Sequence, residues 1–254
     1  MPFTKSEIAA FEIAIRTIDK AVVRMESLVP PPTWTQLHGA TYAHRYVERQ
    51  ARQALILKSV RLSSALRAGW VLLQNGLVLD AGATMRALDE LESDIMFIAG
   101  PLLFQQPFEK RHDQYLAEFF QEEFDHPDPV QATQRRNRVS RRDIRAYVAR
   151  TYNAGLPVSQ VVALNETIDA TFSGYVHGAA VHIFDVYDGR TFVLPLRTTD
   201  QRLSDMMEQY VLYVHRAMMA VAVASKVFGN SGPFEAVYRA VQSVFTDDGR
   251  IQTR

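Results

Sequence analysis

Residues 80–101 read DAGATMRALDELESDIMFIAGP, and this stretch indicates which class of fold the chain adopts. Apolar side chains recur in it every three or four positions, the spacing of the buried side of an amphipathic helix: Met85, Leu88, Leu91, Ile95 and Ile98. The pair Gly100-Pro101 predicts where this helix ends. We therefore expect one long helix here, and the same spacing recurs along most of the chain.

The first helix is predicted to begin at Thr4 and Glu7, which have the spacing of a capping box, and to end near residue 29, before three consecutive prolines. Later helices are predicted from apolar spacing, from glycines that can end a helix and from prolines that can begin one. They cover residues 42–73, 80–101, 107–124, 140–155, 157–178, 199–228 and 233–245. The sequence thus predicts an all-α fold, a multi-helix bundle of about eight helices.

Two segments are expected to modify this bundle. Residues 181–194, VHIFDVYDGRTFVL, place an Asp-Gly pair between β-branched and aromatic residues, which predicts a small β-hairpin insert. Residues 30–41 are rich in proline and are expected to link the N-terminal helix, residues 1–29, to the bundle, with Trp34 docking on it. No internal repeat divides the chain, so we expect a single helical domain over residues 1–254.

The composition excludes several classes of protein. The 254 residues include 28 basic and 28 acidic side chains, so no overall charge attracts nucleic acid or a membrane. The absence of cysteine excludes disulfides, thiolate metal sites and cysteine nucleophiles. The first residues lack the apolar core of a signal peptide, and the most apolar stretch, residues 217–224, is too short to cross a bilayer. We expect a soluble, cytoplasmic protein without membrane contacts.

Charge is segregated in the middle of the chain. An acidic run, which contains Glu118, Glu122, Glu123, Asp125 and Asp128, precedes an arginine-rich segment. Four of its arginines are expected on one face of a helix: Arg138, Arg141, Arg142 and Arg145. Such a face can bind phosphates, which favours RNA or another nucleic acid as partner. The alternative is that the two runs pair with each other or stay solvated, which their closeness in sequence favours.

A second candidate site combines polar residues from two predicted helices. Arg86 and Glu90 lie one helical turn apart at the boundary of the predicted core. Ser173 and His177 have the same spacing on a later helix. A serine, a histidine and a glutamate fixed by an arginine could form an acid–base site. The alternative is a hydrogen-bond cluster that orients the two helices.

The pattern Arg86-x-x-x-Glu90 followed by Ser173-x-x-x-His177-Gly178 resembles a bacterial family of all-helical proteins of unknown function. The resemblance covers about half of the chain and implies a helical bundle with a polar site at those residues. It is distantly similar to HEPN-type helical domains, many of which are ribonucleases. The nuclease signature of that group is an arginine followed by a histidine after four to six residues, and this sequence lacks it.

The other motifs in the sequence give little evidence of a catalytic or metal-binding site. Glycine-rich phosphate loops and the G-x-S-x-G elbow are absent from the sequence. The dipeptide His112-Asp113 occurs about as often as chance predicts, and Glu123-x-x-His126, which has di-iron spacing, occurs once where two copies are needed. His182 and Asp185 could join His177 as metal ligands, but their geometry does not follow from the sequence. We predict no metal and no cofactor.

The helix expected at residues 199–228 carries a Met/Ala/Val face with two alternative roles: it packs in the core, or it forms the symmetric interface of a homo-oligomer through this helix. The leading functional hypothesis is a binding or regulatory module with a polar Arg/Glu/Ser/His cluster. Two alternatives are a HEPN-like protein that binds nucleic acid through its arginine-rich helix and a metal-independent acid–base enzyme at Glu90 and His177.

Overall fold

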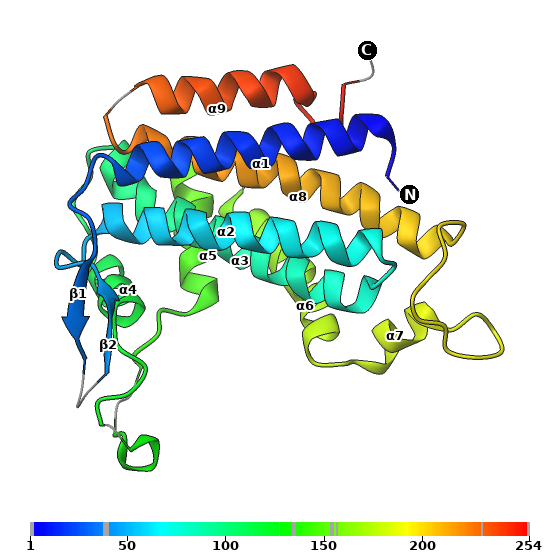
Figure 1. Ribbon diagram of the computed structural model, residues 1–254, viewed down its shortest axis with the longest axis horizontal. Coiled ribbons are helices and arrows are strands. Elements are labelled where there is room, and N and C mark those ends of the chain that lie inside the picture. The colour runs from blue at the N-terminus through cyan, green and yellow to red at the C-terminus, as the bar shows by residue number, and fades with distance from the viewer. Residues whose placement is uncertain are drawn as a thin grey trace.

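A computed structural model describes residues 3–37, 41–126, 128–133, 136–152, 155, 157–229 and 231–252, without the side chains at 129, 169 and 231. This part of the chain forms helices and one small hairpin, as predicted (Figure 1). The elements in chain order are α1 Lys5–Glu26, β1 Thr33–Gln36, β2 Tyr42–Arg45, α2 Ala51–Gln74, α3 Val78–Leu103, α4 Lys110–Phe119, the 3-10 turn η1 Pro129–Gln131, α5 Arg141–Tyr152, α6 Val158–Val176, α7 Ala180–Ile183, the 3-10 turn η2 Phe184–Val186, α8 Gln201–Lys226 and α9 Ser231–Val244.

Helix α3 is the centre of the bundle. It packs against α2, α8, α6 and α5, while α1 and α9 cover α8 from the other side (Figure 1). The apolar residues that predicted this helix line the core, and Met85, Leu88 and Ile95 are fully buried. The helix continues two residues past Pro101, and Gly100 lets the ring of Tyr147 approach the backbone there.

An aromatic stack fastens the N-terminal helix to the core. The rings of Phe3 and Phe11 stack on Trp70 of α2, with ring centroids 4.0 and 4.1 Å away. Tyr210 of α8 packs beside this stack and donates its hydroxyl proton to the backbone carbonyl of Leu66. The predicted capping box at Thr4 and Glu7 is present and begins α1. Helices α1, α2 and α8 are therefore held together by rings as well as by aliphatic packing.

The hairpin lies at a different place from the one expected. Strands β1 and β2 pair in antiparallel register within residues 33–45, a range that the prediction divided between a linker and the start of a helix. Helix α2 therefore begins at Ala51 rather than at residue 42. Trp34 does not dock on the bundle: its side chain is 63% exposed and contacts Tyr42 and His44 across the hairpin. The prolines before it exclude helix, which leaves the aromatic and threonine residues free to extend.

Residues 181–194 form a turn rather than the expected pair of strands. The predicted Asp-Gly turn is present, because the carboxylate of Asp188 accepts the backbone N–H groups of Arg190 and Thr191. Pairing stops at one antiparallel bridge between Tyr187 and Phe192. Residues 180–186 coil into α7 and η2, so the first strand has no extended backbone to build on.

The other predicted helices are present with shifted ends. The helix expected over residues 107–124 is shortened to α4, and the one expected over residues 140–155 ends at Tyr152 in the described chain. Positions 153 and 154, where that end was predicted, lie outside the described residues. The Met/Ala/Val face of α8 is buried within the same chain against α3, α9, α1 and α2. That face is occupied by the chain's own core, so it is not available to a second copy.

Leu88→Ala is expected to lower the free energy of unfolding by about 3 kcal/mol, because the site is fully enclosed at the centre of α3 and a cavity would remain. Leu57→Ala on α2, where the side chain is 38% exposed, should cost less than about 1 kcal/mol. Urea unfolding of both variants measures the difference. Equal losses would contradict the central place of α3.

Candidate functional site

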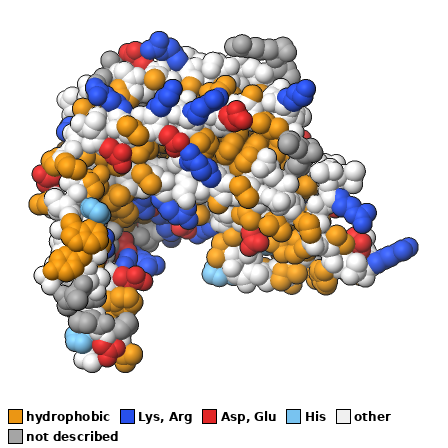
Figure 2. All heavy atoms as spheres, in the orientation of Figure 1, with side chains coloured by type: hydrophobic (Ala, Val, Ile, Leu, Met, Phe, Trp, Pro, Cys, Tyr) orange, Lys and Arg blue, Asp and Glu red, His pale blue; other side chains and the backbone are white. Residues whose placement is uncertain are grey.

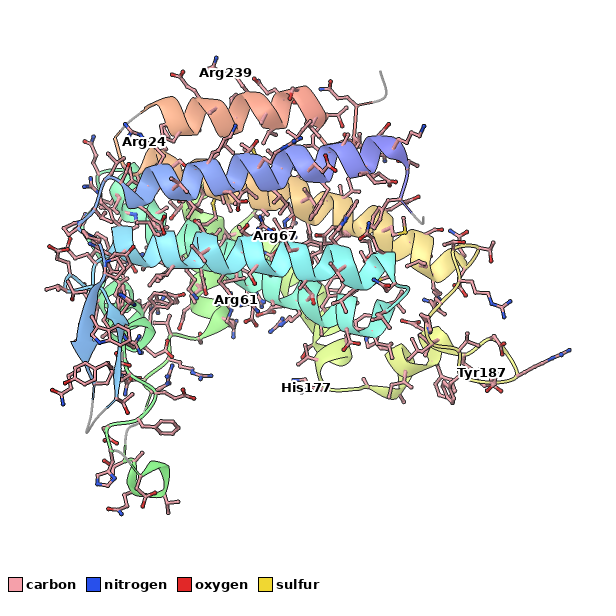
Figure 3. All side chains as sticks on the ribbon, viewed as in Figure 1. Arg24, Arg61, Arg67, His177, Tyr187 and Arg239 are labelled. Carbon is pink, nitrogen blue, oxygen red and sulfur yellow. The ribbon has the colours of Figure 1, made fainter. Side chains whose placement is uncertain are left out.

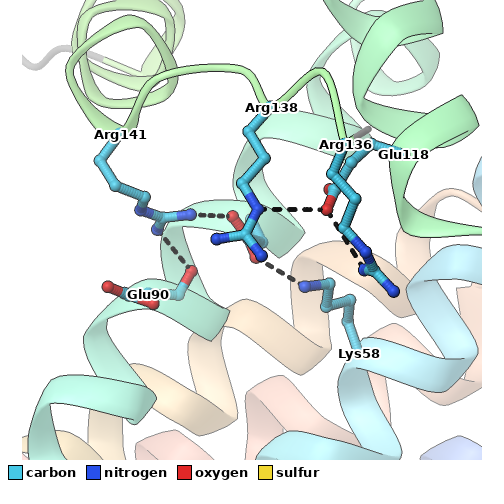
Figure 4. Close-up of polar contacts among 7 residues, drawn as sticks. Lys58, Glu90, Glu118, Arg136, Arg138 and Arg141 are labelled. Atoms are coloured by element: carbon cyan, nitrogen blue, oxygen red, sulfur yellow. Dashed lines mark hydrogen bonds and ion pairs between the residues drawn. The ribbon is translucent and has the colours of Figure 1, made fainter. Parts of the chain in front are cut away.

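The arginine-rich segment does not form one exposed face. Arg138 precedes α5, and Arg145 is buried inside the bundle. Arg141 is half-buried: it pairs with Asp94 of α3 at 2.5 Å and donates a hydrogen bond of 2.9 Å to the backbone carbonyl of Glu90 (Figure 4). Arg142 is exposed, 3.8 Å from Glu166 of α6. Each of the four arginines thus lies near an acidic side chain of the same chain, and for the buried Arg145 this is Asp89, 4.0 Å away.

The acidic run supplies only part of the pairing that the alternative hypothesis expected. Glu118 lies 3.5 Å from Arg136 and 3.6 Å from Arg138, as Figure 4 shows. Glu122 of the same run pairs with Arg45 of the hairpin. The arginines within α5 find their acidic partners on α3 and α6 instead.

Helix α3 carries a row of buried carboxylates that the sequence interpretation missed. Asp89, Glu92 and Asp94 are each 5% exposed, although they lie among the apolar residues that predicted the helix. Arg216 of α8 reaches two of them, at 2.8 Å from Asp89 and 2.6 Å from Glu92. Burial, together with the neighbouring Asp89, raises the pKa of Glu92 to about 8 in spite of Arg216. Burial lowers the pKa of Arg216, but the two neighbouring acids together raise it above its usual value, so Arg216 stays charged.

The third buried carboxylate joins two further helices. Lys58 of α2 lies 2.7 Å from Asp94, on the opposite side from Arg141. Lys58 also lies over the rings of Tyr115 and Phe119 of α4. Helices α2, α3, α4 and α5 therefore meet at this carboxylate. Each buried acid in the row has a cation beside it, which makes the row an internal ionic framework rather than an open site.

The four residues of the predicted polar cluster are not brought together. Arg86 and Glu90 form the predicted pair, 2.8 Å apart on α3. His177 lies at the exposed C-terminal end of α6 (Figure 3), where its backbone N–H bonds to the carbonyl of Ser173. Just before that end, Tyr175 rests against Gly82, where an added Cβ would lie 2.5 Å from the ring. Glu90 lies eight residues further along α3, about 12 Å away along the helix axis.

The structure instead places a polar cleft at the end of the bundle where α6, α7, η2 and α8 meet. The cleft has a volume of about 310 Å³ and a floor formed by Val78, Phe172 and Met206. Its polar wall is formed by Tyr175, His182, Asp185 and Arg202. Thr171, Val181, Asp205 and Gln209 complete the lining. An apolar floor with a few converging polar groups is the usual form of a small-ligand site.

Asp185 is the centre of this wall. Its carboxylate accepts the hydroxyl proton of Tyr175 at 2.6 Å and pairs with Arg202 at 2.9 Å. The Nδ1 atom of His182 lies 3.7 Å from it. Burial and the hydrogen bond to Asp185 raise the pKa of Tyr175 above its usual range, so this hydroxyl remains a donor. Arg202 is 60% exposed and has further N–H groups beyond the one on Asp185.

Local sequence explains how these side chains meet. The ring of His182 packs at a tilt of 30° on the ring of Tyr175, with centroids 4.1 Å apart, and its edge fits against Gly174, where any Cβ would clash. Gly178 has a φ of 63° and lets the chain turn back from α6 into α7. Asp200 caps the first turn of α8, which carries Arg202. The glycines and the spacing of His182 and Asp185 were visible in the sequence, but their convergence with α8 was not.

The remaining histidine motifs have structural surroundings. His112 is buried between Phe97 and Tyr147, and its Nδ1 atom accepts the backbone N–H of Glu109. Burial lowers the pKa of His112, so the ring is neutral. His126 packs its Nδ1 atom against the backbone of Asp128. Within the described residues, no three His, Asp or Glu side chains converge as a metal site requires.

Comparison with family models, with curated proteins and with solved structures finds no match for this chain. The resemblance to a family of helical proteins therefore stays a prediction. No helix in the described ranges combines the length and apolar character that a bilayer crossing requires.

Arg216→Met is expected to lower the free energy of unfolding by about 3 kcal/mol, because it removes the nearer of the two cations beside the buried carboxylate of Asp89 and leaves Arg145 at 4.0 Å. Arg239→Met removes an exposed arginine of α9 that pairs with Glu235, and should cost less than about 1 kcal/mol. Denaturant unfolding of the two variants at neutral pH checks this. A small loss for Arg216→Met would contradict the framework.

Glu92→Gln is expected to change how stability depends on pH. Folded Glu92 keeps its proton up to about pH 8, whereas the unfolded side chain loses it near pH 4.5, so this group lowers wild-type stability as pH rises between those values. The stability of Glu92→Gln relative to wild type should therefore increase over that window. Unfolding curves at several pH values measure the difference, and Glu235→Gln, on the exposed side of α9, is the control. Parallel pH profiles for wild type and Glu92→Gln would count against a raised pKa.

Proposed function

We propose that this chain is a binding module for a small ligand and that the cleft between α6, α7 and α8 is its site. One observation carries the proposal: Tyr175, His182 and Arg202 converge on the carboxylate of Asp185 in the wall of a cleft whose floor is apolar. These polar groups come from different elements and hold each other in place. Such a preorganised wall can orient a ligand without first having to become ordered.

The lining defines the kind of ligand. Phe172 and Met206 offer contact to a compact apolar body. Arg202 keeps unused donors, while Asp205 and Gln209, on the following turns of the same helix α8, offer acceptors. A ligand with an apolar body and a polar head that both donates and accepts hydrogen bonds fits this lining. Past Asp205 and Gln209 the cleft adjoins a wider groove of about 870 Å³, which gives a longer ligand room to extend.

The other hypotheses have less support. Nucleic-acid binding through the arginine-rich segment would need the four arginines on the surface, and Arg141 and Arg145 are engaged inside the bundle. An acid–base site at Glu90 and His177 would need these side chains in one cleft, and they lie at different ends of the contact between α3 and α6. The binding module therefore remains our leading proposal, with its site moved to Asp185 and its neighbours.

A matched pair of threonines on α6 tests the proposal. Thr171 lines the cleft and Thr167, one turn earlier, does not; both are exposed, and both hydroxyls bond to the carbonyl four residues before them. Thr171→Trp should fill the cleft and abolish the binding of small polar fragments detected by ligand-observed NMR, whereas Thr167→Trp should leave it unchanged. Fragments that bind Thr171→Trp as well as wild type, or a screen without hits on wild type, would contradict a site in this cleft.

A further inference from the structure

Several apolar side chains remain exposed beside the cleft, within residues 176–194. We call this set the apolar knob; its residues are Val176, Val181, Ile183, Phe184, Tyr187, Phe192 and Leu194. Their exposed fractions run from 39% for Ile183 to 70% for Val181. Figure 2 shows hydrophobic side chains gathered at this end of the molecule, at lower right. A patch of this kind on a folded protein marks a surface that another molecule covers.

The knob is a shaped surface rather than a loose loop. The rings of Phe184, Tyr187 and Phe192 contact one another, with centroids 5.1 to 5.9 Å apart. Val193 donates a backbone hydrogen bond of 2.7 Å to Val186, whose side chain is buried. The segment is also tied to the bundle, because the N–H of Leu196 bonds to the carbonyl of Gly76 in the turn between α2 and α3. A partner would therefore meet a preformed site.

The size of the knob fits a protein partner. With three aromatic and four aliphatic side chains about half exposed, it offers roughly 600 Å² of apolar surface. Two such surfaces placed face to face would bury about 1,200 Å², the lower limit of a specific protein–protein interface. The apolar knob is thus large enough for a dimer in which each copy covers the knob of the other.

The charges around the knob favour a second copy over a lipid surface. Asp188 and Arg190 lie two residues apart at the exposed tip of the turn, and Arg197 follows Leu194. An anionic membrane would need an excess of basic side chains around the apolar residues, and the tip carries both signs. Around a twofold axis, Asp188 of one copy can pair with Arg190 of the other, and Arg190 with Asp188.

We propose that two copies of this chain associate through the apolar knob about a twofold axis. This interface takes the place of the oligomer predicted through residues 199–228, whose Met/Ala/Val face lies in the core. Phe184 and Phe192 are its central anchors, since aromatic side chains at the centre of an interface contribute most of its affinity. The proposal does not depend on the ligand, although Val181 belongs to both the knob and the lining of the cleft.

Sedimentation velocity of the full chain over a wide range of concentrations tests the proposal. Wild type is expected to reach twice the 28.8 kDa mass of one chain. Phe184→Glu and Phe192→Glu should each weaken the dimer by roughly thirtyfold or more, the effect of losing one anchor. Trp34→Glu, an equally exposed aromatic residue on the hairpin, is the matched control and should leave the dimer unchanged. Circular dichroism establishes that each variant is folded.

Hydrogen exchange of the wild type supplies a measurement that needs no variant: residues 181–194 should exchange more slowly at high concentration than at low concentration. A wild type that stays monomeric at every concentration would overturn the proposal. A dimer that Trp34→Glu weakens and the two Phe variants do not would overturn it as well. Monomers that bind phosphatidylcholine vesicles through Phe192 would assign the knob to a lipid surface and overturn it too.

Discussion

The guanidinium of Arg216, which reaches the buried acids Asp89 and Glu92, sets the alignment of the two longest helices of the bundle. Apolar contacts between α3 and α8 would tolerate a shift by one turn, since one aliphatic side chain can replace another in the core. The ion cluster does not tolerate that shift, because a carboxylate moved away from its cation would stay buried and unpaired, at a cost of several kcal/mol. Once α8 is fixed in this way, its first turn brings Arg202 to the cleft at the other end.

The need of a buried acid for a nearby cation also explains why part of the arginine-rich segment lies inside the bundle. Asp94 lies between Lys58 and Arg141 and joins α2, α3 and α5, so α5 is held by charge as well as by the packing of Tyr147 on Gly100. Arginine suits this position because its long apolar stem can lie along the core while its planar head reaches an acid. A cluster of basic residues in a sequence can therefore be the inner lining of a fold, and its count alone does not define a surface.

Helical periodicity predicted the class of the fold because the spacing of residues such as Leu88 and Ile95 depends on the helix alone. The buried acids escaped notice because Asp89 and Glu92 flank apolar positions and look like solvent-facing residues unless Arg216, more than a hundred residues later, is placed opposite them. The cleft was not predicted for the same reason, since Asp185 becomes the centre of a polar site only when α6 and α8 bring Tyr175 and Arg202 to it. Contacts between distant segments carry no local signal. The hairpin at residues 33–45 was not predicted for a local reason: the prolines before it were interpreted as part of a linker.

The hairpin packs mainly on itself, and Arg45 fastens it to Glu122 in the segment that follows α4. This ion pair lies outside the core, and among the described elements the two strands make their main contacts with each other. Lengthening the hairpin would disturb no packed layer, and each doubling of a flexible loop costs only about 0.6 kcal/mol of chain entropy. This corner of the molecule can therefore accept inserted sequence, such as a tag or a peptide grafted for display, while the bundle keeps its arrangement.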